Sequence, residues 1–367
     1  MASSVACCVC VVGTRPEAIK LAPIIKLLAR TPWAKPVTVT TGQQSDLLDN
    51  TLCGFGIQSD VGIPYETPLD LGSNLARIIE RLDQTFQRIG PQIVIAQGDT
   101  TTALAACMAA FYRRIPFVHV EAGLRSGELN SPYPEEYHRR MIAISAAINC
   151  APTERAAQNL INEKVSRDTI HVTGNTVIDA LLQTARAKPP IPAQFPKGDK
   201  TILLTTHRRE SFGQPMREAL SAVRSFLDAN PDVSVFFPVH PNPTARDVAL
   251  DVLGSHPQAV LNPALSYRDL VASMQKSWVV LTDSGGLQEE APALGKPVLI
   301  LRDSTERPEM VEAGAARIVG TRRASVIGAL SELAQSSATY QRMARPAFPY
   351  GKGNSAGRIV GLLPSIL

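Results

Sequence analysis

Residues 93–121 read IVIAQGDTTTALAACMAAFYRRIPFVHVE, and this stretch decides the fold. Two short apolar runs, Ile93–Ala96 and Phe117–Val120, flank a segment long enough for a helix. This pattern predicts a strand, a crossover helix and a second, parallel strand.

Carboxylates follow these runs. Asp99 comes after the first run and Glu121 directly after the second, and Glu135 and Glu136 lie in the proline-bounded loop SPYPEEYHRR (131–140). Ligands of open α/β sheets bind outside the carboxyl ends of the strands. Acids held there by rigid strands are candidates for proton transfer.

The alternation of apolar runs with helix-length segments continues along the chain and predicts an α/β fold with parallel sheets. The runs are apolar without interruption, so both faces of each sheet should be covered. The first series is Val5–Val12, Val37–Thr40, Ile93–Ala96, Phe117–Val120, Ala147–Ala151 and Ile170–Thr173, and the second is Thr201–Thr205, Val233–Val239, Val260–Asn262, Trp278–Thr282, Pro297–Leu301 and Ala316–Val319.

A proline-rich stretch, KPPIPAQFPKGDK (188–200), separates the two series and predicts a surface loop or a domain boundary. We therefore expect two Rossmann-like, doubly wound domains with a cleft between them. The expected domains are residues 1–173, with the carboxylates, and 174–350, with further loops after strands. A C-terminal segment, residues 351–367, is expected to pack back on the N-terminal domain.

Composition excludes several kinds of partner. The formal net charge of +4 over 367 residues and the lack of any long Lys or Arg run argue against nucleic-acid and membrane partners. No apolar run reaches the ~20 residues that span a bilayer, and the N-terminus lacks a basic region, so we interpret it as the first strand. The six scattered cysteines favour buried thiols in a reducing cytoplasm over metal or disulfide sites.

Two loops are suited to an anion. GTRPEAIK (13–20) places Arg15 and Lys20 at a helix start whose free N–H groups attract negative charge. TDSGGLQEE (282–290) offers two glycines and a hydroxyl before a helix expected to begin near Leu287. Glu289 or Glu290, in the first turn of that helix, is then a candidate for hydrogen bonds to ribose. The alternatives are an ordinary solvated helix start for the first loop and a structural Gly-rich turn for the second.

Two further loops after strands carry cationic or titratable groups. THRRESFG (206–213) contains His207, a side chain that titrates near neutral pH and can donate to a diphosphate. Arg307 lies in DSTERPE (303–309), where a loop ion pair is the alternative to phosphate binding. The chain has neither a dinucleotide nor a P-loop fingerprint, which argues against NAD and ATP hydrolysis.

Taken together, these segments resemble the non-hydrolysing UDP-N-acetylglucosamine 2-epimerases. The matching segments, in chain order, are GTRPEAIK, GDTTTALA, HVEAGLRSG, SPYPEE, TGNTVIDAL, THRRESFG, PVHPNP, LTDSGGLQEEAPALGKPVL and TERPE. The resemblance implies two Rossmann-like domains in the GT-B arrangement, UDP-GlcNAc and UDP-ManNAc as the substrate pair, no cofactor, no catalytic metal and a homodimer.

The resemblance also implies roles for single residues. The catalytic carboxylates fall on Asp99, Glu121 and Glu135, and the catalytic histidine falls on His207. The UDP contacts fall on Arg15, Lys20, Ser284, Gly285, Gly286, Glu290 and Arg307. One or two of the carboxylates could instead serve only to orient Arg125 or Arg139.

The chain departs from the family pattern in three places. Gln43-Gln44-Ser45 replaces Gln-His-Arg in a loop associated with activation by UDP-GlcNAc. His138 stands where the family usually has Asn, and Leu270 stands where an aromatic residue often lies near uracil. Other functions weighed against the epimerase are a hydrolysing or related-sugar epimerase, a GT-B glycosyltransferase and a non-catalytic UDP-sugar sensor.

Overall fold

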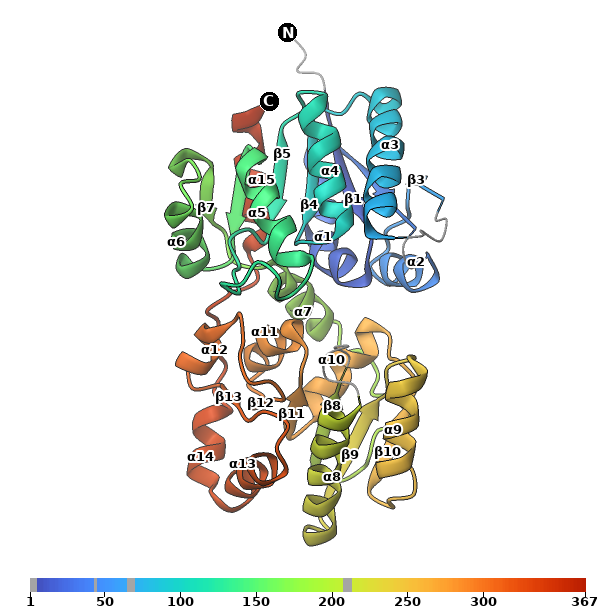
Figure 1. Cartoon of the computed structure of the whole chain (residues 1–367), viewed down its shortest axis with the longest axis vertical. Coiled ribbons are helices and arrows are strands. Elements are labelled where there is room, and N and C mark those ends of the chain that lie inside the picture. Colours follow the sequence, from blue (N-terminus) through green and yellow to red (C-terminus); the bar gives the residue numbers. More distant parts are fainter. Residues whose placement is uncertain (1–4, 43–44, 65–69, 207–212) are drawn as a thin grey trace. The chain divides into compact units, whose positions relative to one another are not determined.

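The computed structural model describes residues 5–42, 45–64, 70–206 and 213–367. The chain divides into two compact units: Met1–Ala180 with Tyr350–Leu367, and Leu181–Pro349. Each unit is built on a parallel sheet flanked by helices (Figure 1). The predicted α/β class with two Rossmann-like domains is confirmed.

The sheet of the first unit has seven strands in the order β3-β2-β1-β4-β5-β6-β7, and all neighbouring strands are parallel. The strands are β1 (Ala6–Val12), β2 (Ala34–Thr40), β3 (Val61–Gly62), β4 (Ile93–Gln97), β5 (Phe117–Val120), β6 (Ile148–Ala151) and β7 (Ile170–Val172). The sequence predicted all of them except β3. That strand has only two residues, one of them glycine, and is too short to show an apolar run.

Helices cover both faces of this sheet. They are α1 (Arg15–Leu28), α2 (Ser45–Gly54), α3 (Leu71–Ile89), α4 (Thr101–Tyr112), α5 (Glu135–Ser145), α6 (Glu154–Asn162), the start of α7 (Thr176–Arg186) and α15 (Ser355–Leu362). Alternate residues of β1 point into two different cores. Cys8 and Cys10 pack with residues of α1, α2 and α15, whereas Val9 and Val11 pack with residues of α3, α4 and α5. Because both sets are buried, the strand is apolar throughout.

The C-terminal segment is part of the first unit. Ile359 and Val360 of α15 lie in the same core cluster as Leu21 of α1. Asp179 of α7 caps α15 by accepting hydrogen bonds from the backbone N–H groups of Ser355 (3.1 Å) and Ala356 (3.0 Å). Burial raises the pKa of Asp179, and these hydrogen bonds oppose that effect.

The second unit has a six-stranded parallel sheet in the order β10-β9-β8-β11-β12-β13. Its strands are β8 (Lys200–Thr205), β9 (Val233–Pro238), β10 (Ala259–Asn262), β11 (Val279–Thr282), β12 (Val298–Ile300) and β13 (Ala316–Ile318). Its helices are the rest of α7, α8 (Gln214–Ala229), α9 (Pro243–Leu253), α10 (Tyr267–Lys276), α11 (Gly285–Ala293), α12 (Pro308–Glu312), α13 (Arg323–Gln335) and α14 (Ser337–Met343). No helix in the described part of the chain is long and apolar enough to cross a membrane.

Strand order fixes where each unit can bind a ligand. In the first sheet the order reverses between β1 and β4, and their following helices α1 and α4 pack on opposite faces. In the second sheet the order reverses between β8 and β11. Loops at such a reversal diverge and leave a crevice at the carboxyl ends of the strands. The four motif loops after β1, β4, β8 and β11 all begin there.

Candidate active site

The loop after β1 is tied to the turn after β4 by Glu17, a buried carboxylate of α1. Glu17 accepts hydrogen bonds from the N–H of Gly13 (2.9 Å) and from the hydroxyl of Thr100 (2.6 Å). A Cβ at Gly13 would lie 2.1 Å from Oγ1 of Thr102, so only glycine allows this approach. The half-buried Arg15, the first residue of α1, therefore directly follows a fixed loop.

Glu121 follows β5 in a strained conformation. Its φ of 67° is left-handed, which costs a non-glycine residue about 1–2 kcal/mol. Its carboxylate accepts hydrogen bonds from Nζ of Lys20 (2.5 Å), Nε2 of Gln97 (3.0 Å) and Nδ2 of Asn175 (2.5 Å). Backbone and side chain are thus both held, a combination that is frequent at functional sites.

Lys20 is part of this arrangement. Its ion pair with Glu121 joins side chains that are only 9% and 7% exposed. In the structure its ammonium group stabilises a candidate catalytic carboxylate, and its contact with UDP stays a prediction.

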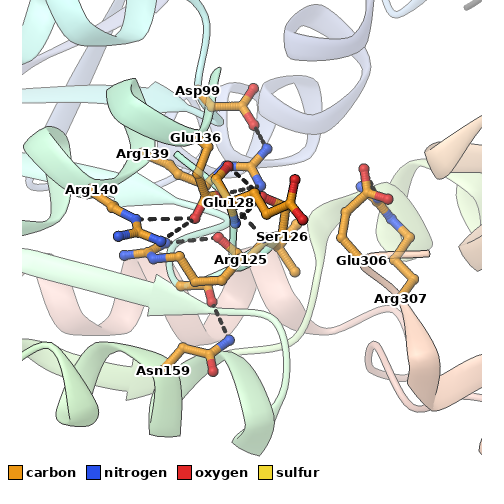
Figure 2. Close-up of polar contacts among 12 residues, drawn as sticks. Asp99, Arg125, Ser126, Glu128, Glu136, Arg139, Arg140, Asn159, Glu306 and Arg307 are labelled. Carbon is orange, nitrogen blue, oxygen red and sulfur yellow. Dashed lines mark hydrogen bonds and ion pairs between the residues drawn. The ribbon is translucent and has the colours of Figure 1, made fainter. Parts of the chain in front are cut away.

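Asp99 lies in the turn between β4 and α4. Its carboxylate contacts Nη2 of Arg139, a residue of α5 (Figure 2). Nη1 of the same guanidinium donates to Glu136 at 3.2 Å. Asp99 therefore does contact Arg139, whereas Arg125 pairs with Glu163 at 2.7 Å. The side chain of Asp99 keeps 28% of its surface exposed, so it can still reach a substrate.

Glu135 and its neighbour Glu136 have different environments. Glu136 is fully buried and accepts hydrogen bonds from the N–H of Ser126 (3.1 Å) and from Nη2 of Arg140 (2.9 Å), which joins the loop after β5 to α5 (Figure 2). Glu135 begins α5 and is half-buried. Within the described residues it has no hydrogen bond or ion pair. Glu136 thus connects the loop after β5 to α5, whereas no described residue pairs with the carboxylate of Glu135.

The loop after β11 leads directly into the N-terminus of α11. The N–H of Ser284 donates to Oγ1 of Thr282 at 2.9 Å, and the side chain of Ser284, the N-cap residue, makes no capping hydrogen bond. Among the described residues, a Cβ at Gly286 would meet no atom within 4 Å apart from its chain neighbours and the backbone of α11. This space would allow a ligand to approach the backbone closely.

Arg307 lies beside this loop. Its Nε donates to Oε1 of Glu289 at 2.6 Å, and its Nη1 is 3.6 Å from Glu306. A Cβ at Gly285 would lie 2.6 Å from Nη1 of Arg307, so that glycine makes room for the guanidinium. The loop ion pair considered for Arg307 is present, and it fixes the cation against the β11–α11 loop.

The position of Glu290 corrects one detail of the sequence interpretation. Helix α11 begins at Gly285 and not near Leu287, so Glu289 and Glu290 lie in its second turn. Helices tolerate glycine at their first positions, so two glycines did not mark the boundary. The hydroxyl of the buried Tyr267 donates to Oε1 of Glu290 at 3.2 Å and orients that carboxylate.

Some predicted residues cannot be placed. His207 lies outside the described residues, as do Gln43 and Gln44, so their roles stay predictions. Other residues at these sites were missed, namely Gln97, Asn175 and Tyr267. Gln97 directly precedes the segment GDTTTALA, Asn175 lies within the segment TGNTVIDAL, and Tyr267 lies outside the quoted segments. The sequence assigned no role to any of them; their contacts with Glu121 and Glu290 identify them. In the described part of the chain, no group of three or more His, Cys, Asp or Glu side chains is suited to hold a metal ion.

Comparison with known proteins agrees with this arrangement. A family model described as UDP-N-acetylglucosamine 2-epimerase matches residues 26–364. The UDP-N-acetylglucosamine 2-epimerase of Escherichia coli strain K12 is 42% identical over 364 residues, which cover 96% of this chain and 97% of that protein. The protein of the same name from Bacillus subtilis strain 168 is 43% identical over 355 residues, covering 95% of this chain and 93% of that protein.

Solved structures give the same result. The UDP-GlcNAc 2-epimerase from Neisseria meningitidis, solved with UDP-GlcNAc bound, has a TM-score of 0.93 and 38% identity, and the match covers 98% of this chain and 100% of that one. A Methanocaldococcus jannaschii UDP-GlcNAc 2-epimerase in complex with UDP-GlcNAc and UDP has a TM-score of 0.85 at 29% identity, covering 98% and 99%. The chain belongs to the UDP-N-acetylglucosamine 2-epimerase family.

Proposed function

We propose that this enzyme interconverts UDP-GlcNAc and UDP-ManNAc without net hydrolysis. The observation that carries the proposal is the setting of three carboxylates. Asp99 and Glu121 follow adjacent strands and are each held by a buried cation. Glu135 begins the helix that supplies one of those cations, Arg139.

The reaction needs two proton-transfer groups. The C2–H of the sugar is not next to a carbonyl, so a base alone cannot remove it. Expulsion of UDP from C1 builds positive charge at the anomeric carbon and acidifies the C2 proton. One carboxylate then takes that proton and leaves a 2-acetamidoglucal. A second acid returns a proton to the opposite face as UDP adds back, so Asp99, Glu121 and Glu135 supply the two roles.

The leaving diphosphate must be stabilised as it departs. We assign this role to Arg15, Lys20 and His207 and to the loop of the second unit, with Ser284, Gly285, Gly286 and Arg307; Glu290 binds ribose. A charge-assisted hydrogen bond contributes about 1.5–3 kcal/mol. A few such contacts lower the elimination barrier by orders of magnitude.

An NMR time course with UDP-GlcNAc in D2O tests the proposal. We expect UDP-ManNAc to form without an acceptor and to carry deuterium at C2. Free ManNAc with UDP would identify a hydrolysing epimerase, and consumption only with an added acceptor would identify a glycosyltransferase. Tight binding without turnover would identify a sensor. A product without deuterium would contradict proton exchange with solvent.

We further propose that the enzyme is a homodimer. Apolar side chains of α4 and α5 are exposed, among them Phe111 (61%), Tyr112 (71%), Met141 (41%) and Ile144 (73%). The ends of these two helices line one groove of about 740 Å³. A face of this kind on a monomer is typical of an interface. Ile144→Glu should convert a dimer to a monomer in analytical ultracentrifugation, and Leu250→Glu, at an exposed site on α9, should not.

We propose a cytoplasmic location as well. All six cysteines have free thiols, the state expected in a reducing compartment. Fractionation of the native cell followed by immunoblotting tests this location, and recovery outside the cytoplasmic fraction would contradict it.

A further inference from the structure

The turn that carries Asp99 is held at its backbone as well as at its side chain. Its two successive carbonyl groups, those of Gly98 and Asp99, each face a ring nitrogen of a buried histidine. The two histidines come from different elements, His119 from β5 and His138 from α5. A carbonyl oxygen only accepts, so in each pair the ring nitrogen carries the hydrogen.

His119 lies beside the turn with no exposed surface. Its Nε2 donates to the carbonyl of Gly98 at 2.8 Å. Gly98 has a left-handed φ of 79°, which turns the chain sharply out of β4 immediately before Asp99. Burial lowers the pKa of His119 to about 4, which favours the neutral ring at physiological pH. The contact of His119 with the turn is therefore the hydrogen bond from its Nε2 to the carbonyl of Gly98.

His138 contacts the turn from helix α5. It is 5% exposed, and its Nδ1 donates to the carbonyl of Asp99 at 2.9 Å. The next residue, Arg139, contacts the carboxylate of the same Asp99. Two consecutive residues of α5 thus hold the backbone and the side chain of one aspartate.

We infer that His119 and His138 are positioning residues that set the orientation of the Asp99 carboxylate. The inference rests on the proposed function, in which Asp99 takes part in proton transfer. General acid–base catalysis requires the carboxylate within hydrogen-bond reach of the proton it moves. A misplacement of about 1 Å at a reacting group can cost about 100-fold in rate. Neither histidine needs to touch the substrate to have this effect.

The donor atom of each histidine can be mimicked by a different amide. In glutamine, Nε2 is as many bonds from Cα as Nε2 of histidine; in asparagine, Nδ2 is as many bonds from Cα as Nδ1. Gln should therefore replace His119 and Asn should not, whereas Asn should replace His138 and Gln should not. If each position needed only a polar side chain, Asn and Gln would have the same order of activity at both positions.

The experiment compares His119→Gln, His119→Asn, His138→Asn and His138→Gln in the full chain. We call His119→Gln and His138→Asn the matched variants and His119→Asn and His138→Gln the mismatched ones. We expect kcat to fall by at least about 30-fold in the mismatched variants and by no more than about fivefold in the matched ones, within the range a misplaced reacting group produces. KM and UDP affinity should stay within about twofold, because the proposed diphosphate contacts are other residues. Equal kcat in the matched and mismatched variants of both histidines would overturn the inference.

A second readout does not depend on activity. Hydrogen–deuterium exchange of the segment 98–103 should be faster in the mismatched variants than in the matched ones. If the wild-type chain fails to epimerise UDP-GlcNAc, the proposed function fails, and exchange still decides whether the histidines hold the turn. If the His119 variants do not fold, the His138 pair decides alone. Unchanged exchange in both His138 variants would contradict the inference.

Discussion

Arg307 and Glu289 form an ion pair of 2.6 Å between side chains that are 9% and 0% exposed. The guanidinium occupies the space that a side chain at Gly285 would need. For the adjacent Gly286, the described part of the chain places no such group within 4 Å. The two glycines that begin α11 thus differ: among the described residues, the guanidinium of Arg307 restricts position 285, and no such contact restricts position 286.

Gly285→Ala and Gly286→Ala should therefore behave differently. Gly285→Ala places a Cβ 2.6 Å from the fixed guanidinium, so both thermal stability and UDP affinity should fall. Gly286→Ala should keep or raise stability, by up to about 1 kcal/mol, because alanine is the better helix former. Its UDP affinity should still fall by about tenfold or more if a methyl group blocks the diphosphate, a loss of roughly 1.4 kcal/mol.

Calorimetry measures both effects, one by titration with UDP and the other by thermal scanning. Wild-type UDP affinity in Gly286→Ala would mean that the diphosphate does not lie against this loop.

Glu135→Gln and Glu136→Gln form a second matched pair. Glu135 has no described polar partner, so its amide variant should unfold at the same temperature as the wild type. Its kcat should fall by about 100-fold or more, as for loss of a general acid or base. Glu136 is buried among Arg139, Arg140 and the N–H of Ser126, so Glu136→Gln should lower stability as well as activity.

Steady-state kinetics and thermal melts distinguish the two variants. Near wild-type kcat in Glu135→Gln would remove Glu135 from the chemistry.

Substituting only one residue of the buried pair Lys20 and Glu121 should lower the unfolding free energy more than substituting both. Lys20→Met leaves a buried carboxylate without its cation, which should cost about 3–5 kcal/mol of unfolding free energy. Lys20→Met combined with Glu121→Gln removes both charges and should recover a large part of that loss. Urea denaturation of Lys20→Met, Glu121→Gln and the double variant, each compared with wild type, gives the coupling energy. If the loss of unfolding free energy in the double variant equals the sum of the losses in the two single variants, the ion pair contributes little to stability.

His119 should make stability depend on pH. An unfolded histidine titrates near 6.5, whereas burial lowers the pKa of His119 to about 4. Between these values the unfolded chain binds a proton that the folded chain does not, so stability falls as pH decreases from about 6.5 to about 4. The total is of the order of 3 kcal/mol, at about 1.4 kcal/mol per pKa unit.

His119→Gln removes this titration. The difference in unfolding free energy between wild type and variant should therefore change by that amount between pH 7 and pH 4, measured by urea denaturation. A difference that stays constant with pH would show that His119 titrates normally in the folded chain.

The sequence predicted most of the sheet architecture because parallel strands buried on both faces are apolar throughout. It located the loops after β1, β4, β5 and β11 for the same reason. It did not reveal which side chains hold the predicted carboxylates. Asn175 reaches Glu121 from 54 positions away in the chain, and that pairing depends on the order of β5, β6 and β7. No local pattern encodes such an order.

The histidines show the same limit. His119 lies within an apolar run and gave no motif signal, although it is within hydrogen-bonding distance of the Asp99 turn. His138 stood out only as a departure from the family pattern, where asparagine is usual. The structure gives that departure a physical reason, since the contact of His138 with the carbonyl of Asp99 is one that an asparagine amide can also make.

The cap that Asp179 places on α15 bears on how the chain assembles during synthesis. The core around α1 is incomplete until residues 355–363 have emerged from the ribosome, after every residue of the second unit. The second unit can finish folding first, although it is encoded later. Until α15 has been made, the Leu, Ile and Ala side chains of α1 that share its core cluster lack these packing partners.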